Sequence, residues 1–330
     1  MSLPQTPEPE LSLEIDPLSY FGLRETRRIK DRLVVTIADR AYLPDTTDLQ
    51  RDWLSSVAAP AFRLLRDRRG EGACRAFASI GTGSGADALA AIEIFGAETI
   101  GITDLFGDVV DTAAGNIRRN LRPGVDVTLH SGAGDLLSPL RERGLRFDVV
   151  YENLPNLPLA EAGHIEVGRT SAAFIPPRGE AVPDFVKEWL LVLHYLALVE
   201  ARDLLNPGGT VVSVIGARLP LEILSRMAVA AGYTPAFLTY SWKVQADPVD
   251  VIGSYAQWQR GGLGPFYFYP AARLAEAFAV LDPQDAGRNA LSIEASLKPA
   301  RLDAVEAWDA FQRGERIGHT VAVLQSGPSD

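Results

Sequence analysis

The stretch AFASIGTGSGADALAAIEIF, residues 76–95, decides the fold of this 330-residue chain. A short apolar run ends at Ile80, three glycines follow within five residues, and an alanine-rich apolar run continues to Phe95. This pattern predicts a strand, a tight turn and a helix, because glycine adopts backbone conformations that other residues avoid. Such a turn directs backbone N–H groups and a helix N-terminus toward a ligand. We therefore expect a nucleoside-bearing ligand at this turn.

Apolar strands and helical segments alternate along the chain after this stretch. We expect strands at residues 99–103, 125–130, 147–151 and 210–215, and helices at residues 109–120, 139–144, 185–205 and 221–231. Alternation of this kind predicts an α/β fold, Rossmann-like and doubly wound, in which helices cover both faces of a mostly parallel sheet.

The two flanks of this core have different patterns. Residues 1–12 are expected to form a tail and residues 16–69 a helical lead-in that Pro44 interrupts. Later segments predict a strand at 236–244, helices at 271–281 and 304–313, and a last strand at 320–324. The chain thus divides into a tail and lead-in (1–70), a ligand-binding core (71–245) and a C-terminal extension (246–330). We expect this extension to complete the sheet and a substrate pocket.

The composition restricts the partners. The formal net charge is −10 and the sequence pI is about 5.0, so the protein repels phosphate backbones and a nucleic-acid partner is disfavoured. The single cysteine, Cys74, rules out an intramolecular disulfide, and four scattered histidines disfavour a metal site. The first residues lack the apolar segment of a secretory signal, and residues 189–199 are too short to span a bilayer. We expect a cytoplasmic protein, and the oligomeric state stays open.

The glycine spacing alone leaves the ligand open. Gly81, Gly83 and Ala86 also fit the G-x-G-x-x-G/A pattern of nicotinamide cofactors. Asp104, at the end of the next predicted strand, suits either kind of ligand because a carboxylate there accepts hydrogen bonds from ribose hydroxyls.

Two later segments separate the alternatives. Ser131-Gly132-Ala133-Gly134-Asp135-Leu136-Leu137 follows the third predicted strand, and the fourth reads FDVVYENLPN, residues 147–156. Together with the glycine turn and Asp104, this ordered set resembles the class I S-adenosylmethionine-dependent methyltransferases over about residues 75–240. It is most similar to the branch with an N-P-P-Y motif, typified by the glutamine N5-methyltransferases of release factors.

The resemblance implies a seven-stranded methyltransferase sheet, an enzymatic activity and a cofactor, S-adenosylmethionine, with S-adenosylhomocysteine as product. It assigns the methionyl part of the cofactor to the turn formed by Ile80, Gly81, Thr82, Gly83 and Gly85. It places the ribose diol on Asp104, with Leu105 beside the adenine, and it assigns the adenine to Gly134, Asp135 and Leu136. Asn153 would face both the cofactor and the acceptor.

The chain departs from the family pattern at two positions. Ser79 occupies the usual acidic position two residues before the first glycine, where its hydroxyl can only partly replace a carboxylate as the partner of the cofactor's ammonium. The motif N-P-P-Y has become Asn153-Leu154-Pro155-Asn156, which lacks the aromatic residue that would stack on a planar acceptor.

The expected chemistry is in-line displacement of a methyl group onto a nitrogen of a small molecule or protein side chain. The Asn153 amide oxygen and the Leu154 carbonyl would accept both hydrogens of an N–H₂ group and aim its lone pair, while Pro155 stiffens the turn. A plain polar turn is the alternative interpretation of this segment. His164 is a candidate general base for another acceptor, and His194 is interpreted as a core residue.

Three other functions remain open at this stage. The first is an O-methyltransferase of a small molecule. The second is an NAD(P)-dependent oxidoreductase, although the sequence contains no Tyr-x-x-x-Lys motif. The third is a non-catalytic cofactor-binding protein.

Overall fold

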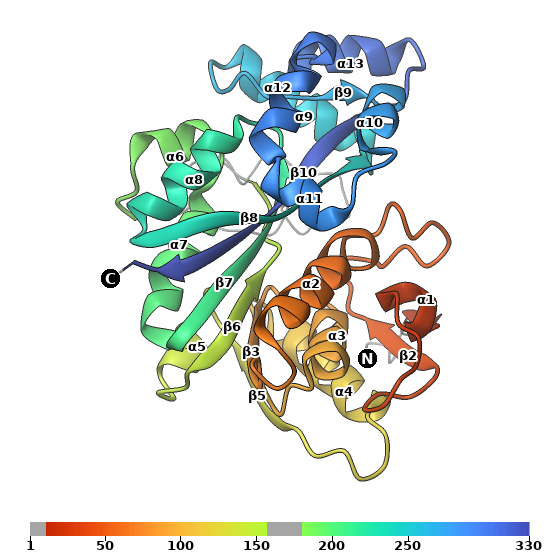
Figure 1. The fold of residues 1–330 in the computed structure, drawn as a ribbon, viewed down its shortest axis with the longest axis vertical. Coiled ribbons are helices and arrows are strands. Elements are labelled where there is room, and N and C mark those ends of the chain that lie inside the picture. The colour runs from red at the N-terminus through yellow and green to blue at the C-terminus, as the bar shows by residue number, and fades with distance from the viewer. Residues whose placement is uncertain (1–10, 157–179, 330) are drawn as a thin grey trace, which may run out of the picture.

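A computed structural model of the chain describes residues 11–156 and 180–329. Its centre is a mostly parallel sheet in the strand order β5-β4-β3-β6-β7-β10-β8, and a short strand, β9, pairs with β10 as the eighth (Figure 1). A separate two-stranded sheet joins β1 to β2. The expected α/β architecture, with helices on both faces of the sheet, is confirmed.

The elements have the following bounds. The strands are β1 Leu11–Ile15, β2 Leu33–Ile37, β3 Ala76–Ile80, β4 Thr99–Asp104, β5 Thr128–Ala133, β6 Phe147–Glu152, β7 Leu205–Ala217, β8 Tyr233–Val244, β9 Tyr269–Pro270 and β10 Ile317–Pro328. The α-helices are α1 Pro17–Phe21, α2 Ala59–Arg69, α3 Ala86–Phe95, α4 Gly107–Asn120, α5 Ser138–Arg141, α6 Asp184–Glu188, α7 Val192–Ala201, α8 Leu221–Ala230, α9 Pro248–Arg260, α10 Ala271–Phe278, α11 Pro283–Arg288, α12 Ala290–Leu297 and α13 Ala304–Gln312. A π-helical turn, η1 Leu54–Ala58, precedes α2, and two single 3₁₀ turns are η4 Arg202–Leu204 and η5 Lys298–Ala300.

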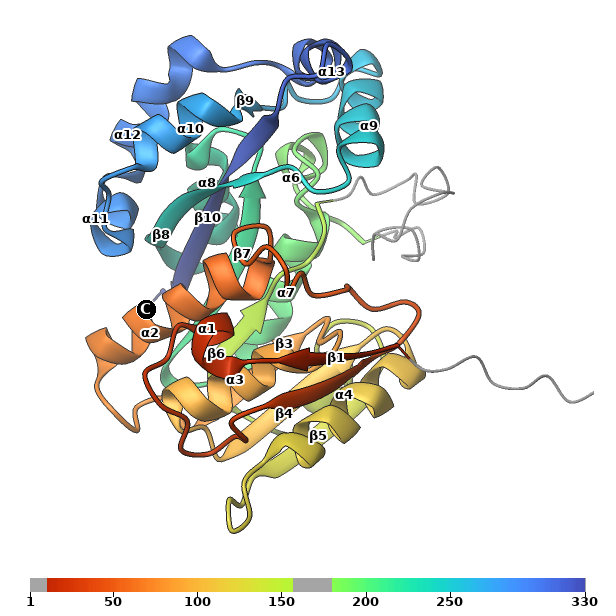
Figure 2. The same cartoon turned by 90° about the vertical axis from the view of Figure 1, so that its right-hand side faces the viewer.

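Five strands run parallel, and their carboxyl ends meet at one edge of the sheet. The pairs β4–β5, β3–β4, β3–β6 and β6–β7 are all parallel, whereas β10 lies antiparallel between β7 and β8. The expected last strand at residues 320–324 lies inside β10. The chain therefore returns from its C-terminal helices into the sheet between β7 and the edge strand β8, as the dark blue arrow in Figure 2 shows. Within the described residues, no helix combines the length and apolar character needed to cross a membrane.

The prediction of a helical lead-in over residues 16–69 was wrong in its middle. Residues 33–37 read LVVTI and form β2, which pairs antiparallel with β1. Leu11 and Ser12 also belong to β1, so the expected tail at 1–12 extended two residues too far. Valine and isoleucine favour strands, and this preference is realised here because β1 supplies a partner strand, with Leu13 opposite Val35.

The single helix predicted for residues 185–205 is broken into α6 and α7. Leu190 between them adopts a positive φ of 61°, which a helix cannot include, and its side chain is buried. The chain then enters β7 at Leu205, earlier than the expected residue 210. The strand predicted at 125–130 is likewise shifted, since β5 runs from Thr128 to Ala133.

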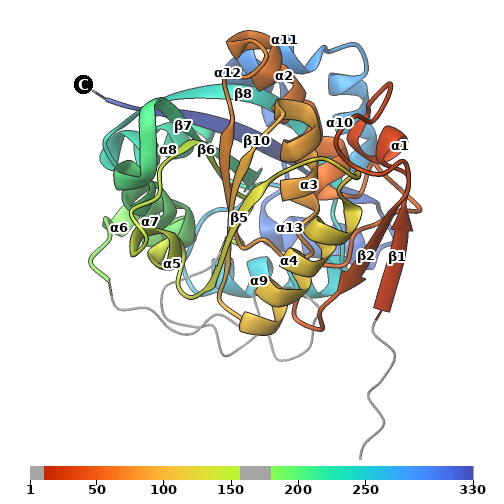
Figure 3. The same cartoon turned by 90° about the horizontal axis from the view of Figure 1, so that it is seen from below.

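Two asparagines of α4 complete the free edge of β2, which lies beside this helix in Figure 3. The Asn116 side chain accepts a hydrogen bond from the Thr36 N–H at 2.9 Å and donates to the Thr36 carbonyl at 2.7 Å. Asn120 makes the same pair of bonds to Val34, both at 2.9 Å. Asn116 also donates to the Ser84 carbonyl at 2.9 Å, inside the glycine turn. These amides therefore attach the N-terminal sheet to the core and to the turn.

We predict that Asn116→Leu lowers the free energy of unfolding by about 3 kcal/mol or more, because three buried backbone groups lose their partner at about 1–3 kcal/mol each. Urea denaturation measures this loss. Arg118→Ala, on the exposed face of the same helix, is the control and should stay within about 0.5 kcal/mol of the wild type. Equal stability of the two variants would contradict the role assigned to Asn116.

Candidate active site

A cavity of about 360 Å³ opens at the carboxyl edge of the parallel strands. Its volume falls in the range of sites for small molecules and cofactors. All of the residues predicted from the sequence line it except Gly85: they are Ile80, Gly81, Thr82, Gly83, Asp104, Leu105, Gly134, Asp135, Leu136, Asn153 and Pro155. The ends of β3, β4, β5 and β6 bring these residues together, because parallel neighbours end at one edge.

The glycine turn has the backbone that the sequence requires. Gly81, Gly83 and Gly85 have φ values of 66°, 50° and 79°, which residues with a Cβ rarely adopt. Gly85 faces away from the cavity, and a Cβ there would lie 3.0 Å from the Ala113 carbonyl oxygen. Its absent side chain therefore lets α3 pack closely against α4, while Gly81 and Gly83 leave the cavity side of the turn open.

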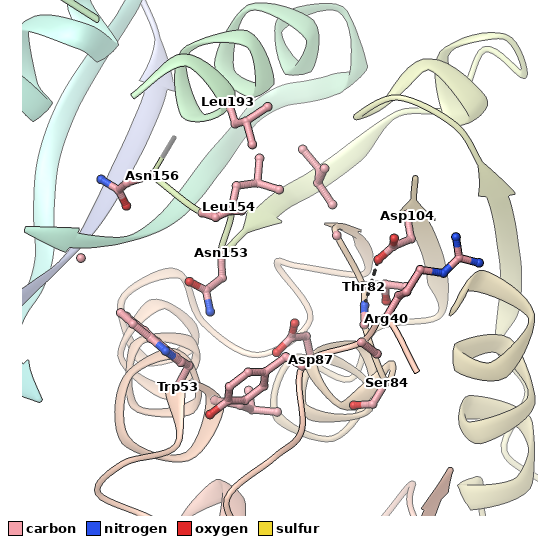
Figure 4. A pocket seen from close by; sticks show the side chains of 18 of the residues that line it. Arg40, Trp53, Thr82, Ser84, Asp87, Asp104, Asn153, Leu154, Asn156 and Leu193 are labelled. Atoms are coloured by element: carbon pink, nitrogen blue, oxygen red, sulfur yellow. Dashed lines mark hydrogen bonds between the residues drawn. The ribbon is translucent and has the colours of Figure 1, made fainter. Parts of the chain in front are cut away.

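Asp104 points from the end of β4 toward the glycine turn. Its carboxylate accepts a hydrogen bond from the Gly83 N–H at 3.3 Å, drawn as the dashed line in Figure 4, and another from the Phe106 N–H at 3.4 Å. Burial raises the pKa of Asp104. The carboxylate is thus fixed at the cavity wall, where ribose hydroxyls would find an acceptor.

The backbone turn that carries Asn153 is fixed by hydrogen bonds of the neighbouring residues. The Glu152 carboxylate accepts a hydrogen bond from the Leu154 N–H at 3.0 Å and contacts His194 Nδ1 at 2.9 Å. Both Glu152 and His194 are fully buried, so this pair fixes the turn from the protein interior. The Asn153 side chain points into the cavity toward Asp87 and Trp53 (Figure 4), where its amide is available to a ligand. His194 is a core residue, as expected.

Two carboxylates that were not predicted from the sequence, Asp52 and Asp87, also line the cavity. Asp87, in the first turn of α3, lines the cavity, and Asp52 from the N-terminal segment lines it too. Asp52 accepts hydrogen bonds from the Ser55 N–H at 2.8 Å and the Asp45 N–H at 3.1 Å. Burial, together with the charge of Asp52, raises the pKa of Asp87 to about 7. Because the charge of Asp52 opposes the ionisation of Asp87, a cationic group bound at this end of the cavity would be favoured.

Aromatic side chains from the segments that flank the core also line the cavity. Tyr20 and Trp53 come from the N-terminal segment, and Tyr255 and Trp258 come from α9. The sequence offers Tyr20, Tyr255 and Trp258 as candidates to cap an acceptor pocket, whereas Trp53 lies in a segment that approaches the cleft only in the folded chain. The four rings thus give the cavity an aromatic surface, which the side chain of Asn156 cannot supply.

Two expectations concern other residues. His164, the candidate general base, lies outside the described residues. Among the described residues, no group of three His, Cys, Asp or Glu side chains is arranged to hold a metal ion.

Several solved structures are similar to this chain, although no family model and no curated protein matches its sequence. The YcgJ protein of Bacillus subtilis is 16% identical with a TM-score of 0.42, covering 82% of this chain and 98% of its own. The ribosomal protein L11 methylase of Lactobacillus delbrueckii subsp. bulgaricus is 17% identical with a TM-score of 0.36, covering 55% and 71%. A T. thermophilus 16S rRNA methyltransferase in complex with AdoMet and guanosine is 18% identical with a TM-score of 0.41, covering 71% and 49%. Since these likenesses are distant, the function proposed below rests on the cavity itself.

We predict that Asp87→Asn stabilises the ligand-free protein at pH 8 but not at pH 4. The folded protein keeps the Asp87 proton up to a pKa of about 7, whereas the unfolded chain releases it near 3.8. The proton's contribution to stability is therefore complete below pH 4 and is lost as the pH rises to 7, by at most about 1.4 kcal/mol per pH unit. Urea denaturation across this range measures the difference. A variant that is less stable than the wild type at every pH would contradict the pKa assigned to Asp87.

Proposed function

We propose that this protein is an S-adenosylmethionine-dependent methyltransferase that transfers the methyl group to a nitrogen of its acceptor. The observation that carries the proposal is the acidic pair Asp52 and Asp87 beside the N-terminus of α3. S-adenosylmethionine carries a sulfonium and an ammonium, which this pair would attract. A nicotinamide cofactor would instead bring its pyrophosphate to this helix end, where Asp87 would repel it.

The remaining wall fits the cofactor. Asp104 offers a carboxylate to the ribose diol, and Asp135 offers one to the adenine amino group beside the apolar side chains of Leu105 and Leu136. Asp87 is the partner that the ammonium needs, since Ser79 is fully buried and does not line the cavity. The glycine turn leaves room for the methionyl chain because it presents no side chains at Gly81 and Gly83.

The chemistry requires little more of the protein than position. The cofactor supplies a methyl group already activated on its sulfonium. Asn153 and the Leu154 carbonyl would accept the hydrogens of an amine and aim its lone pair at the methyl, and the Glu152 carboxylate keeps their turn in place. Trp53 and Tyr255 would exclude water from the acceptor.

The acceptor class is proposed as a small molecule or a protein side chain. The net charge of −10 and the carboxylates that line the cavity oppose the approach of a nucleic-acid backbone. An O-methyltransferase remains the alternative within the same chemistry, because an Asn153 amide can also orient a hydroxyl.

Calorimetric titration with S-adenosylmethionine, S-adenosylhomocysteine and NAD tests the cofactor. We expect saturable binding of both sulfur compounds and none of NAD. Asp104→Ala should weaken the sulfur compounds about 10- to 100-fold, because a hydrogen bond to a charged group contributes about 1.5–3 kcal/mol. Asp111→Ala, an exposed carboxylate on α4, is the matched control and should bind as the wild type does. Binding of NAD alone would overturn the proposal.

The role of Asn153 is tested by transfer of a labelled methyl group from S-adenosylmethionine to a panel of small amines and amino acids. For any acceptor that the wild type methylates, Asn153→Ala should lower kcat about 100-fold, the usual effect of removing one preorganised polar group from a reaction site. The affinity for S-adenosylhomocysteine should change less than about twofold, since the amide acts on the acceptor. An unchanged kcat would make Asn153 an ordinary turn residue.

A further inference from the structure

A buried arginine lines the cavity beyond the residues described so far. Arg218 directly follows β7, at the same edge of the sheet, and only 5% of its surface is exposed. Burial lowers the pKa of its guanidinium. Gly216 lines the cavity beside it, and a Cβ at that position would lie 2.2 Å from Arg218 Nη1. The guanidinium therefore occupies space that exists only because residue 216 is a glycine.

The partners of Arg218 are neutral. Its Nη2 and Nε donate to the Gln245 side-chain oxygen at 2.6 and 3.2 Å. The guanidinium also lies 5.1 and 5.7 Å from the ring centroids of Tyr255 and Phe268. Among the described residues, no carboxylate forms an ion pair with it, and the neutral Tyr255 side chain also forms a hydrogen bond with it. A buried cation without a counter-ion is unfavourable, and its charge remains available to a ligand.

The strand order puts Arg218 on the acceptor side of the cavity. The residues proposed to hold the cofactor follow β3, β4 and β5, and the Asn153 turn follows β6. Arg218 follows β7, which is the next strand beyond β6. Asn153 therefore stands between the cofactor positions and the guanidinium, as a residue that aligns the reacting nitrogen should.

We propose that Arg218 binds an anionic group of the methyl acceptor, and that this group is a carboxylate. That the anion belongs to the methyl acceptor rests on the proposed methyltransferase function. The anion-binding site itself is inferred from the contacts of Arg218 alone. The acceptor is then a small amine that also carries a carboxylate, with its nitrogen at Asn153 and its anion at Arg218.

The surroundings favour a carboxylate over a phosphate. Gln245 accepts from the Nε–H and from one N–H of Nη2, and Tyr255 forms a further hydrogen bond with the side chain, so few of the five guanidinium N–H groups remain for a ligand. Asp247 and Asp250 line the same cavity, and their charges oppose a dianion more than a monoanion. The aromatic rings beside Arg218 suit the apolar part of an organic acid.

The first experiment uses the wild-type protein with benzoate, benzamide and phenyl phosphate as probes. The intrinsic fluorescence of Trp53 and Trp258, which line the cavity, reports binding, and each titration is done with and without saturating S-adenosylhomocysteine. We expect benzoate to bind at least tenfold more tightly than benzamide, which has the same shape without the charge, and more tightly than phenyl phosphate.

Two variants locate the site. Arg218→Met removes the charge, and Gly216→Ala keeps the charge but displaces Nη1. Both should weaken benzoate at least tenfold, leave benzamide unchanged and bind S-adenosylhomocysteine as the wild type does. Arg273→Met removes an equal charge from an exposed ion pair with Glu276 and should leave all three probes unchanged.

The outcomes separate the two proposals. Equal binding of benzoate and benzamide by the wild type overturns the anion site even if no variant folds, and preference for phenyl phosphate overturns the carboxylate. If Arg218→Met loses S-adenosylhomocysteine instead, the guanidinium binds the cofactor's own carboxylate and the inference is wrong. If the wild type binds no S-adenosylhomocysteine but still selects benzoate through Arg218, the methyltransferase proposal fails while the anion site holds.

Discussion

The left-handed backbone of the turn from Gly81 to Gly85 is the constraint on which the rest of the structure depends. The Thr82 N–H donates to the Thr103 carbonyl at 2.9 Å and the Gly83 N–H to Asp104, so the turn fixes the end of β4. The Ser84 carbonyl of the turn accepts a hydrogen bond from the Asn116 side chain, which also forms hydrogen bonds with Thr36 in β2. A Cβ on Gly81 would lie 3.2 Å from the Leu154 side chain, so the turn also sets the position of the Asn153 segment. Four separate parts of the chain are thus aligned by one short loop.

The core of the fold could be predicted from the sequence because its signals are local. Each βα unit carries its own apolar strand, its own turn and its own helix. In the first unit, three closely spaced glycines indicate the backbone conformation of the turn. The errors lie where the outcome depends on distant partners. Residues 33–37 form a strand because β1 and the side-chain amides of Asn116 and Asn120 supply its hydrogen bonds. These partners are distant in the sequence, so the pattern of residues 33–37 itself does not indicate them. The break at Leu190 requires a positive φ in a residue that ordinarily avoids it.

The candidate site likewise contains residues that local sequence signals indicate and residues that only the folded chain brings in. Its residues at the ends of β3 to β6 could be predicted, since the strand ends of a parallel sheet meet wherever the helices between them are regular. Asp87 offered a local signal, because it lies two residues after the last glycine and so in the first turn of the following helix. Asp52 and Trp53 offered none, since they reach the cavity from an N-terminal segment whose position beside the core cannot be predicted from the sequence. Arg218 follows a predicted strand, but only its burial distinguishes it from a surface arginine.

The cavity holds opposite charges on opposite sides of β6, and both are opposed by burial. Burial and the charge of Asp52 raise the pKa of Asp87, and burial lowers that of the Arg218 guanidinium. Neither arrangement stabilises the ligand-free protein, because each removes water from a charge without a full counter-ion in the described residues. A single cation would relieve only the acidic side, and a single anion only the arginine. Two ligands of complementary charge, or one ligand with separated charges, would relieve both at once. The methyl donor and an amine that bears a carboxylate meet this requirement, because the donor brings its cationic groups to Asp87 and the amine brings its anion to Arg218.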